Sequence, residues 1–159
     1  MKPSYPGKSV RASLTRISDL TSPPNANVHG TVFGGHILQL VDKAAAVCAM
    51  RHSAAACVTV AMDRIEFLYA IRVGDLIIVD ARINYAGSTS MEIGVDIYAE
   101  NLIKGTRSHA NSCLVTMVAV DKTGRPVKIP PLLLETREER TRYSAAEARR
   151  AARLNRLKK

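Results

Sequence analysis

The sequence predicts an α+β domain in which an antiparallel β-sheet wraps one long central helix, followed by a basic helix at the C-terminus. Three observations predict this fold class. One long apolar segment has helical periodicity, four later segments have the composition of strands, and only short turns separate those strands. Such turns have no room for the crossovers that join parallel strands, so we expect antiparallel pairing. A chain of 159 residues is long enough for one domain of this kind.

The predicted central helix covers residues 35–52. Its apolar residues recur at intervals of three and four in two overlapping stripes: Ile37, Val41, Ala44, Ala45 and Cys48, and then Leu38, Ala45, Ala46 and Ala49. A helix that is apolar around most of its circumference is typical of an enclosed position, and we expect a partner subunit to complete its cover. The alternative is a generic α+β domain in which this helix is exposed.

The strand-type segments after this helix are 58–69, 76–85, 91–99 and 113–120. In the last of them, apolar residues occupy both the odd-numbered and the even-numbered positions, as expected for a strand that is covered on both faces. We expect the four to form an antiparallel meander. An earlier alternation over residues 10–14 predicts a first strand, which would join an edge of the sheet.

The net charge of +9 is concentrated at the C-terminus, where residues 137–159 contain nine basic and three acidic side chains. The pattern Ser144-Ala145-Ala146-Glu147 is a capping box and predicts the start of the last helix. On that helix Arg149, Arg153 and Arg156 share one face, which is either solvated or available to phosphates. The rest of the chain is nearly neutral, so we expect no nucleic-acid partner.

Three cysteines occur in apolar contexts without any C-x-x-C spacing: Cys48, Cys57 and Cys113. This usage favours buried thiols in a reducing compartment, and we expect a cytoplasmic protein. No apolar stretch approaches the roughly 18 residues of a membrane span, so none is expected. The four histidines lack the spacing of a metal set, and we expect no metal site.

Asp42 is the first candidate for chemistry, because it lies within the apolar helix, where a carboxylate is costly unless it is used or paired. It is either a general base or, with Lys43, part of a solvent-facing seam. The Gly34-Gly35 pair at the helix start leaves backbone N–H groups free to bind a carbonyl or a developing oxyanion. The alternative for this pair is a simple tight turn.

The turn Gly87-Ser88-Thr89-Ser90 offers three hydroxyls and several backbone amides. It is a candidate site for a phosphate or an amide group, or else a solvated turn. Signatures of other enzyme classes are missing from the sequence: it contains no G-x-S-x-G and neither of the glycine-rich phosphate-binding patterns.

Several motifs together resemble one family. The stretch N-A-N-V-H-G-T-V-F-G-G-H-I-L at 25–38, followed by Asp42, is similar to the signature of hotdog-fold acyl-CoA thioesterases of the brain acyl-CoA hydrolase type and their bacterial relatives. Further matches follow in order: R-I-E-F-L at 64–68, V-G-D-L at 73–76, S-M-E-I at 90–93 and A-E-N at 99–101. The resemblance covers roughly residues 8–131, and the combination is far more specific than any single motif.

The resemblance implies a hotdog fold, with a thioesterase domain at 1–131 and a basic helical extension at 132–159. It also implies double-hotdog dimers that assemble as trimers of dimers, and hydrolysis of fatty acyl-CoA to a fatty acid and coenzyme A. By this resemblance Asp42 is the general base, Asn27 comes from the partner subunit to orient water or substrate, and the Gly35 amide polarises the thioester carbonyl.

The same resemblance places coenzyme A, which is part of the substrate, against the turn formed by Gly87, Ser88, Thr89 and Ser90, and it requires no separate cofactor or metal. His36 departs from the bacterial relatives, which often have an apolar or aromatic residue at this position. Two alternatives stay open. One is a hotdog regulator that binds acyl-CoA without hydrolysing it; the other is a related dehydratase, disfavoured because His36 and Asp42 lie six residues apart.

Overall fold

The computed structural model describes residues 5–63 and 65–156. Its elements, in chain order, are β1 (Lys8–Ser9), the 3-10 helix η1 (Val10–Ser13), β2 (Thr15–Leu20), the 3-10 helix η2 (Pro23–Asn25), α1 (Gly34–Ser53), β3 (Ala56–Asp63), β4 (Leu76–Ala86), β5 (Ser90–Asn101), β6 (Thr106–Val120), β7 (Leu132–Leu133) and α2 (Arg137–Arg156). The short β1 and β7 pair in parallel, which ties the N-terminal segment to the chain just before α2.

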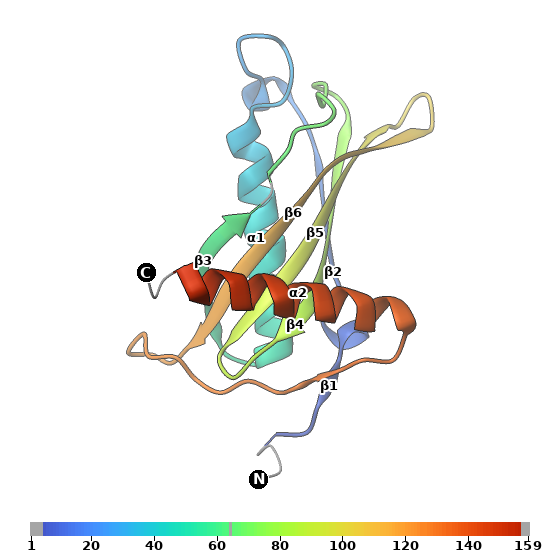
Figure 1. Cartoon of the computed structure of the whole chain (residues 1–159). Coiled ribbons are helices and arrows are strands. Elements are labelled where there is room, and N and C mark those ends of the chain that lie inside the picture. Colours follow the sequence, from blue (N-terminus) through green and yellow to red (C-terminus); the bar gives the residue numbers. More distant parts are fainter. Residues whose placement is uncertain (1–4, 64, 157–159) are drawn as a thin grey trace.

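The main sheet has five antiparallel strands in the order β2-β4-β5-β6-β3, and it curls around α1 (Figure 1). Its inner face carries alternate aliphatic side chains, such as Ile77, Val79, Ile93, Val95 and Val115, which pack with α1 into one core. One helix wrapped by a curled antiparallel sheet confirms the predicted hotdog fold.

Helix α1 buries one side against the sheet and leaves the other side open in the single chain. Its fully buried residues include Val41, Ala44, Ala45, Cys48 and Ala49. On the opposite side Gln39, Lys43 and Met50 are exposed, and Asp42 is half-buried. The cover predicted for most of the helix is therefore incomplete in one chain, and a second copy has room to complete it.

Four sequence expectations about strands are wrong, one of them being the start of the segment predicted at 113–120, which begins seven residues earlier as β6, at Thr106. Residues 10–13 form η1, and the first long strand is β2, which does join an edge of the sheet as expected. The segment predicted at 58–69 ends as a strand at Asp63. Because the chain from there to β4 is longer than expected, it can cross the sheet, and β3 pairs with β6 at the opposite edge, outside the meander.

Helix α2 begins seven residues before the predicted Ser144, at Arg137. Its capping box is formed by Thr136 and Glu139: the Glu139 N–H donates to Thr136 Oγ1 (3.1 Å), and the Thr136 N–H donates to Glu139 Oε2 (3.1 Å). The helix crosses the strands on the outer face of the sheet, away from α1 (Figure 1).

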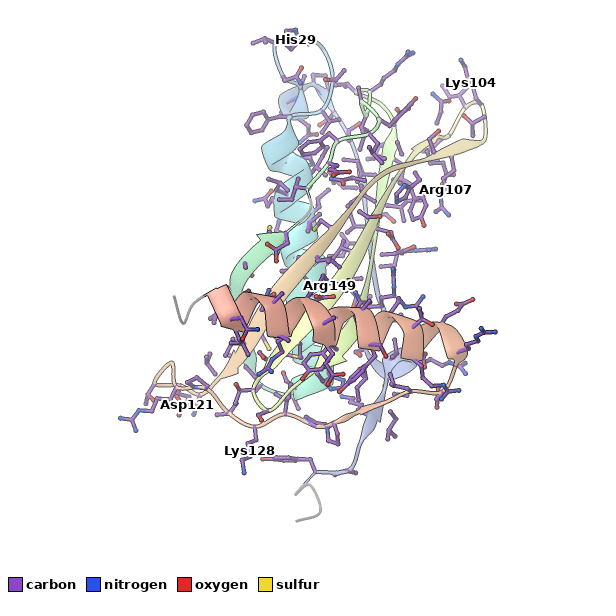
Figure 2. All side chains as sticks on the ribbon, viewed as in Figure 1. His29, Lys104, Arg107, Asp121, Lys128 and Arg149 are labelled. Carbon is purple, nitrogen blue, oxygen red and sulfur yellow. The ribbon has the colours of Figure 1, made fainter. Side chains whose placement is uncertain are left out.

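Contacts with the sheet hold this outer helix in place. Arg149 donates two hydrogen bonds to Glu92 on β5, at 3.0 and 2.7 Å, and Arg153 donates to Thr116 on β6 at 2.7 Å (Figure 2 labels Arg149). The expectation that these arginines are solvated or face phosphates is therefore wrong for both. The side chain of Arg156, the third predicted member of this face, lies outside the described residues.

Within residues 5–63 and 65–156, neither α1 nor α2 holds an 18-residue stretch apolar enough to cross a membrane.

Candidate active site

Asn27 organises the loop that precedes α1. Its Oδ1 accepts the N–H groups of His29 (2.9 Å) and Thr31 (3.2 Å), and its Nδ2 donates to Thr31 Oγ1 (2.9 Å). A β-bridge between Ala26 and Val32 closes the loop behind it. The loop holds Asn27 in a fixed orientation, and since an amide nitrogen carries two hydrogens, one N–H donor is left for a ligand.

The N-terminus of α1 presents backbone N–H groups beside this loop. Its N-cap is Phe33, whose side chain makes no capping hydrogen bond, while the Phe33 carbonyl accepts from His36 (3.0 Å). Among the described residues, no protein group accepts from the Gly35 N–H. A Cβ on Gly35 would lie 2.3 Å from Cε1 of the Phe33 ring, so a side chain there would displace that ring. Gly35 itself is exposed, and glycine leaves the Phe33 ring room to pack against it.

Asp42 lies on the open side of α1 and is paired with Thr59, which no sequence motif indicated. The Thr59 hydroxyl, on β3, donates to Asp42 Oδ1 at 2.6 Å. Thr59 stands between Val58 and Val60, which are 48% and 61% exposed on an edge strand. The one signal in the sequence is a polar residue between two valines, and this pattern does not identify the partner of Thr59.

A single chain does not bring the three predicted catalytic residues together. Asp42 follows Gly35 by seven residues, which is about 10 Å along a helix that rises 1.5 Å per residue. The Asn27 loop lies at the N-terminal end of α1, beyond Gly35 (Figure 1; Figure 2 labels His29 at the tip of this loop). For Asp42 and the Gly35 N–H to act on the same carbonyl group, as the sequence predicts, one of them would have to come from a second copy of the chain.

The turn at 87–90 lies at the other end of the molecule, near the C-terminus of α1 (Figure 1). The Gly87 N–H donates to the Ser90 carbonyl (2.8 Å), while the carbonyls of Ser88 and Thr89 accept from Ile129 (3.0 Å) and Ala119 (2.9 Å). These backbone bonds fix the turn. Ser88 is exposed and the other three residues are half-buried, so Ser88 is the most accessible residue of a rigid turn.

The sequence of residues 29–106 matches the thioesterase superfamily. Protein VdlD of Helicobacter pylori is 39% identical to this chain over 137 residues, which cover 86% of this chain and 78% of VdlD.

Solved structures of similar proteins share the whole fold. The crystal structure of an apo-hexameric acyl-CoA thioesterase is 36% identical, with a TM-score of 0.91 over 96% of this chain and 98% of that one. An acyl-CoA hydrolase from Staphylococcus aureus, in complex with butyryl coenzyme A and coenzyme A, is 32% identical, with a TM-score of 0.85 over 96% of each chain. Other structures of the S. aureus hydrolase are variants with an aspartate, an asparagine or a threonine replaced by alanine.

Proposed function

Since this chain belongs to the thioesterase superfamily, we propose that it hydrolyses fatty acyl-CoA to a free fatty acid and coenzyme A. The observation that carries the proposal is the Asp42 carboxylate, half-buried on the open side of α1 and held there by the Thr59 hydroxyl at 2.6 Å. A positioned carboxylate is what the activation of water requires. Similar proteins that carry acyl-CoA hydrolase names support the substrate class.

The reaction follows from these groups. Asp42 takes a proton from a water molecule whose oxygen attacks the thioester carbonyl carbon. The Gly35 N–H donates to the carbonyl oxygen as it gains negative charge, with help from the dipole of α1. Collapse of the tetrahedral intermediate breaks the C–S bond, and the proton passes to the sulfur of coenzyme A. No metal or separate cofactor takes part in this scheme.

Asn27 and Gly35 of one protomer act with Asp42 and Thr59 of its partner. The separation of about 10 Å along α1 supports this division, because each protomer contributes the N-terminal end of its helix to one site and the middle of its helix to another. Thr59 donates to one carboxylate oxygen, which leaves the second for water. The three residue types altered in the S. aureus variants, Asp, Asn and Thr, are those of this set.

Gly87, Ser88, Thr89 and Ser90 bind coenzyme A in this proposal, through the hydroxyls and backbone amides of their rigid turn. We infer dimers assembled as a trimer of dimers, which the similar hexameric thioesterase supports. The free thiols of Cys48, Cys57 and Cys113 support a reducing compartment such as the cytoplasm.

The test is release of free thiol from a series of acyl-CoA esters, short to long, by the wild type and by Asp42→Asn. We expect kcat to fall by about 10²- to 10⁴-fold in the variant, the usual contribution of a general base. Asp121→Asn, in an exposed turn at the other end of the molecule (Figure 2), is the matched control and should keep wild-type turnover.

Full activity in Asp42→Asn would remove that residue from the mechanism. Tight binding of acyl-CoA without hydrolysis by the wild type would instead support the alternative of an acyl-CoA-binding regulator.

A further inference from the structure

His36 joins three separate segments next to the candidate site. It follows Gly35 in the first turn of α1, and its side chain is 19% exposed. Its Nε2 lies 2.7 Å from Asp19 Oδ2 on β2, and its Nδ1 lies 3.4 Å from Asn25 Nδ2 in η2. The His36 ring is therefore hydrogen-bonded through both of its nitrogens.

The direction of each hydrogen bond can be assigned. The Asn25 Oδ1 accepts from the Ser22 N–H (2.8 Å) and the Ser22 hydroxyl (3.1 Å), so the amide nitrogen of Asn25 is the atom that faces His36. An amide nitrogen only donates, hence His36 Nδ1 accepts. The ring hydrogen is then on Nε2 and is donated to the Asp19 carboxylate.

The same network fixes both ends of the loop that carries Asn27. The Asn25 carbonyl accepts the N–H of Phe33, the N-cap of α1, at 2.8 Å, and the Asn25 side chain reaches the first turn of α1 through His36. Asp19 then joins that turn to the sheet. Both groups assigned to the substrate side of the site, the Asn27 amide and the Gly35 N–H, lie between these fixed points.

We propose that His36 is a positioning residue for the reaction, which holds the Asn27 loop and the Gly35 amide in register with the sheet through Asp19 and Asn25. This inference rests on the proposed hydrolysis. His36 touches neither substrate nor water in it. Because a displacement of about 1 Å costs on the order of 10²-fold in rate, loosening this network should lower kcat while the fold persists.

The test compares His36→Ala, His36→Gln and Asp19→Asn in the thiol-release assay. We expect His36→Ala to lower kcat by about 10- to 100-fold with a much smaller change in KM, because the rest of the acyl-CoA site is intact. A glutamine amide offers one donor and one acceptor, so His36→Gln should recover most of kcat. Asp19→Asn keeps the volume but weakens the acceptor, and its effect should lie between the other two.

His109→Ala is the matched control. His109 also uses its Nε2, in a hydrogen bond to Ser112 Oγ (2.9 Å), and lies 3.7 Å from the Asp96 carboxylate, but on the outer face of the sheet. It should keep the wild-type kcat. Hydrogen–deuterium exchange of residues 25–36 should rise in His36→Ala and not in His109→Ala, and this readout does not depend on activity.

The outcomes separate the two proposals. An inactive wild type contradicts the proposed hydrolysis, and exchange at 25–36 then tests the network alone. An active wild type with unchanged kcat and unchanged exchange in His36→Ala overturns the positioning role. A loss of kcat that glutamine does not restore, and that follows thermal stability across the variants, assigns His36 a purely structural role and also overturns it.

Discussion

Helices α1 and α2 have the same length of 20 residues and pack on opposite faces of the same sheet, yet different forces hold them. α1 places aliphatic and small side chains against the inner face, where Val41, Ala44 and Cys48 are fully buried. α2 buries Ala146 and otherwise contacts the outer face through polar and aromatic groups. These include the Arg149–Glu92 ion pair and the Tyr143 ring, 4.9 Å from that of Tyr85.

The difference shows which contacts a sequence pattern can predict. Apolar periodicity identifies the buried side of α1 because any apolar surface can cover it. The arginines of α2 need particular acceptors, and these lie on β5 and β6, far away in the chain. A basic stripe therefore has the same pattern whether it faces water, a phosphate or a carboxylate on the sheet.

The largest effect is expected from truncating a leucine on the inner helix. Leu40 of α1 is 6% exposed, so Leu40→Ala removes buried methyl groups and leaves a cavity in the core. We expect a loss of about 2–5 kcal/mol in the free energy of unfolding. Urea denaturation at one fixed protein concentration measures it, because assembly also contributes to stability.

Leu154→Ala is the same change on the outer helix, where Leu154 is 41% exposed. Its cost should stay within about 0.5 kcal/mol. Equal losses in the two variants would contradict the contrast between the helices, and a large loss in Leu154→Ala alone would mean that a partner chain covers this face.

A smaller effect is expected from breaking the ion pair that holds α2. The Glu92 side chain is 7% exposed and that of Arg149 is 36% exposed. Arg149→Met leaves a nearly buried carboxylate without its cation, with Asn84 Nδ2 (3.2 Å) as a remaining donor. We expect a loss of about 1–3 kcal/mol, less than for a fully buried pair because Arg149 is partly solvated.

Arg142→Met is the control, since the only ion pair of Arg142 among the described residues is at 3.9 Å to Glu138 on the same helix. It should cost less than about 0.5 kcal/mol. The double variant Glu92→Gln with Arg149→Met should recover part of the loss, because it removes the unpaired charge. If the double variant recovers nothing, the loss in the free energy of unfolding comes from the lost packing of the aliphatic part of the Arg149 side chain.

The sequence predicted the helices and strands in which the buried side chains recur at a regular spacing along the chain. The central helix and the strands now seen as β4 and β5 lie within one or two residues of the expected bounds. The strand predicted at residues 10–14 is wrong because this segment forms η1. Its buried residues, Val10 and Ser13, are three apart, and the apparent alternation concealed this helical spacing. The capping pattern at Ser144 lies inside α2, and the second pattern, at Thr136, is the one that starts the helix.

The candidate site was predicted only in part, for a geometric reason. Asn27, Gly35 and Asp42 were selected on the resemblance, and the structure gives each a defined environment, whereas their catalytic roles stay predictions. Thr59 was missed because its partner is 17 residues away on a different element. Pairings across a sheet depend on register and strand order, and the predicted meander placed β3 at the wrong edge.

The smallest effect concerns the part of the outer face that lies beyond α2, where Asp96 accepts from Arg82 (2.5 Å) and Ser112 (2.6 Å). Burial raises the pKa of Asp96, but the hydrogen bonds from Ser112 and Arg82 outweigh it, and the pKa lies below its ordinary value of 3.8. A carboxyl with a lowered pKa in the folded state stabilises the protein above its unfolded pKa, and that contribution is lost as the pH falls through the folded value.

Asp96→Asn should therefore be less stable than the wild type at neutral pH, by about 0.5–1.5 kcal/mol, and the difference should shrink as the pH falls below 3.8. Urea denaturation across that range measures it, with Glu138→Gln as the control, because the Glu138 side chain is 84% exposed. The Glu138→Gln curve should run parallel to that of the wild type. A difference for Asp96→Asn that stays constant with pH would mean that the side chain stabilises the sheet through packing and not through its charge. Packing would then stabilise the part of the outer face that α2 does not cover, as it stabilises the inner face.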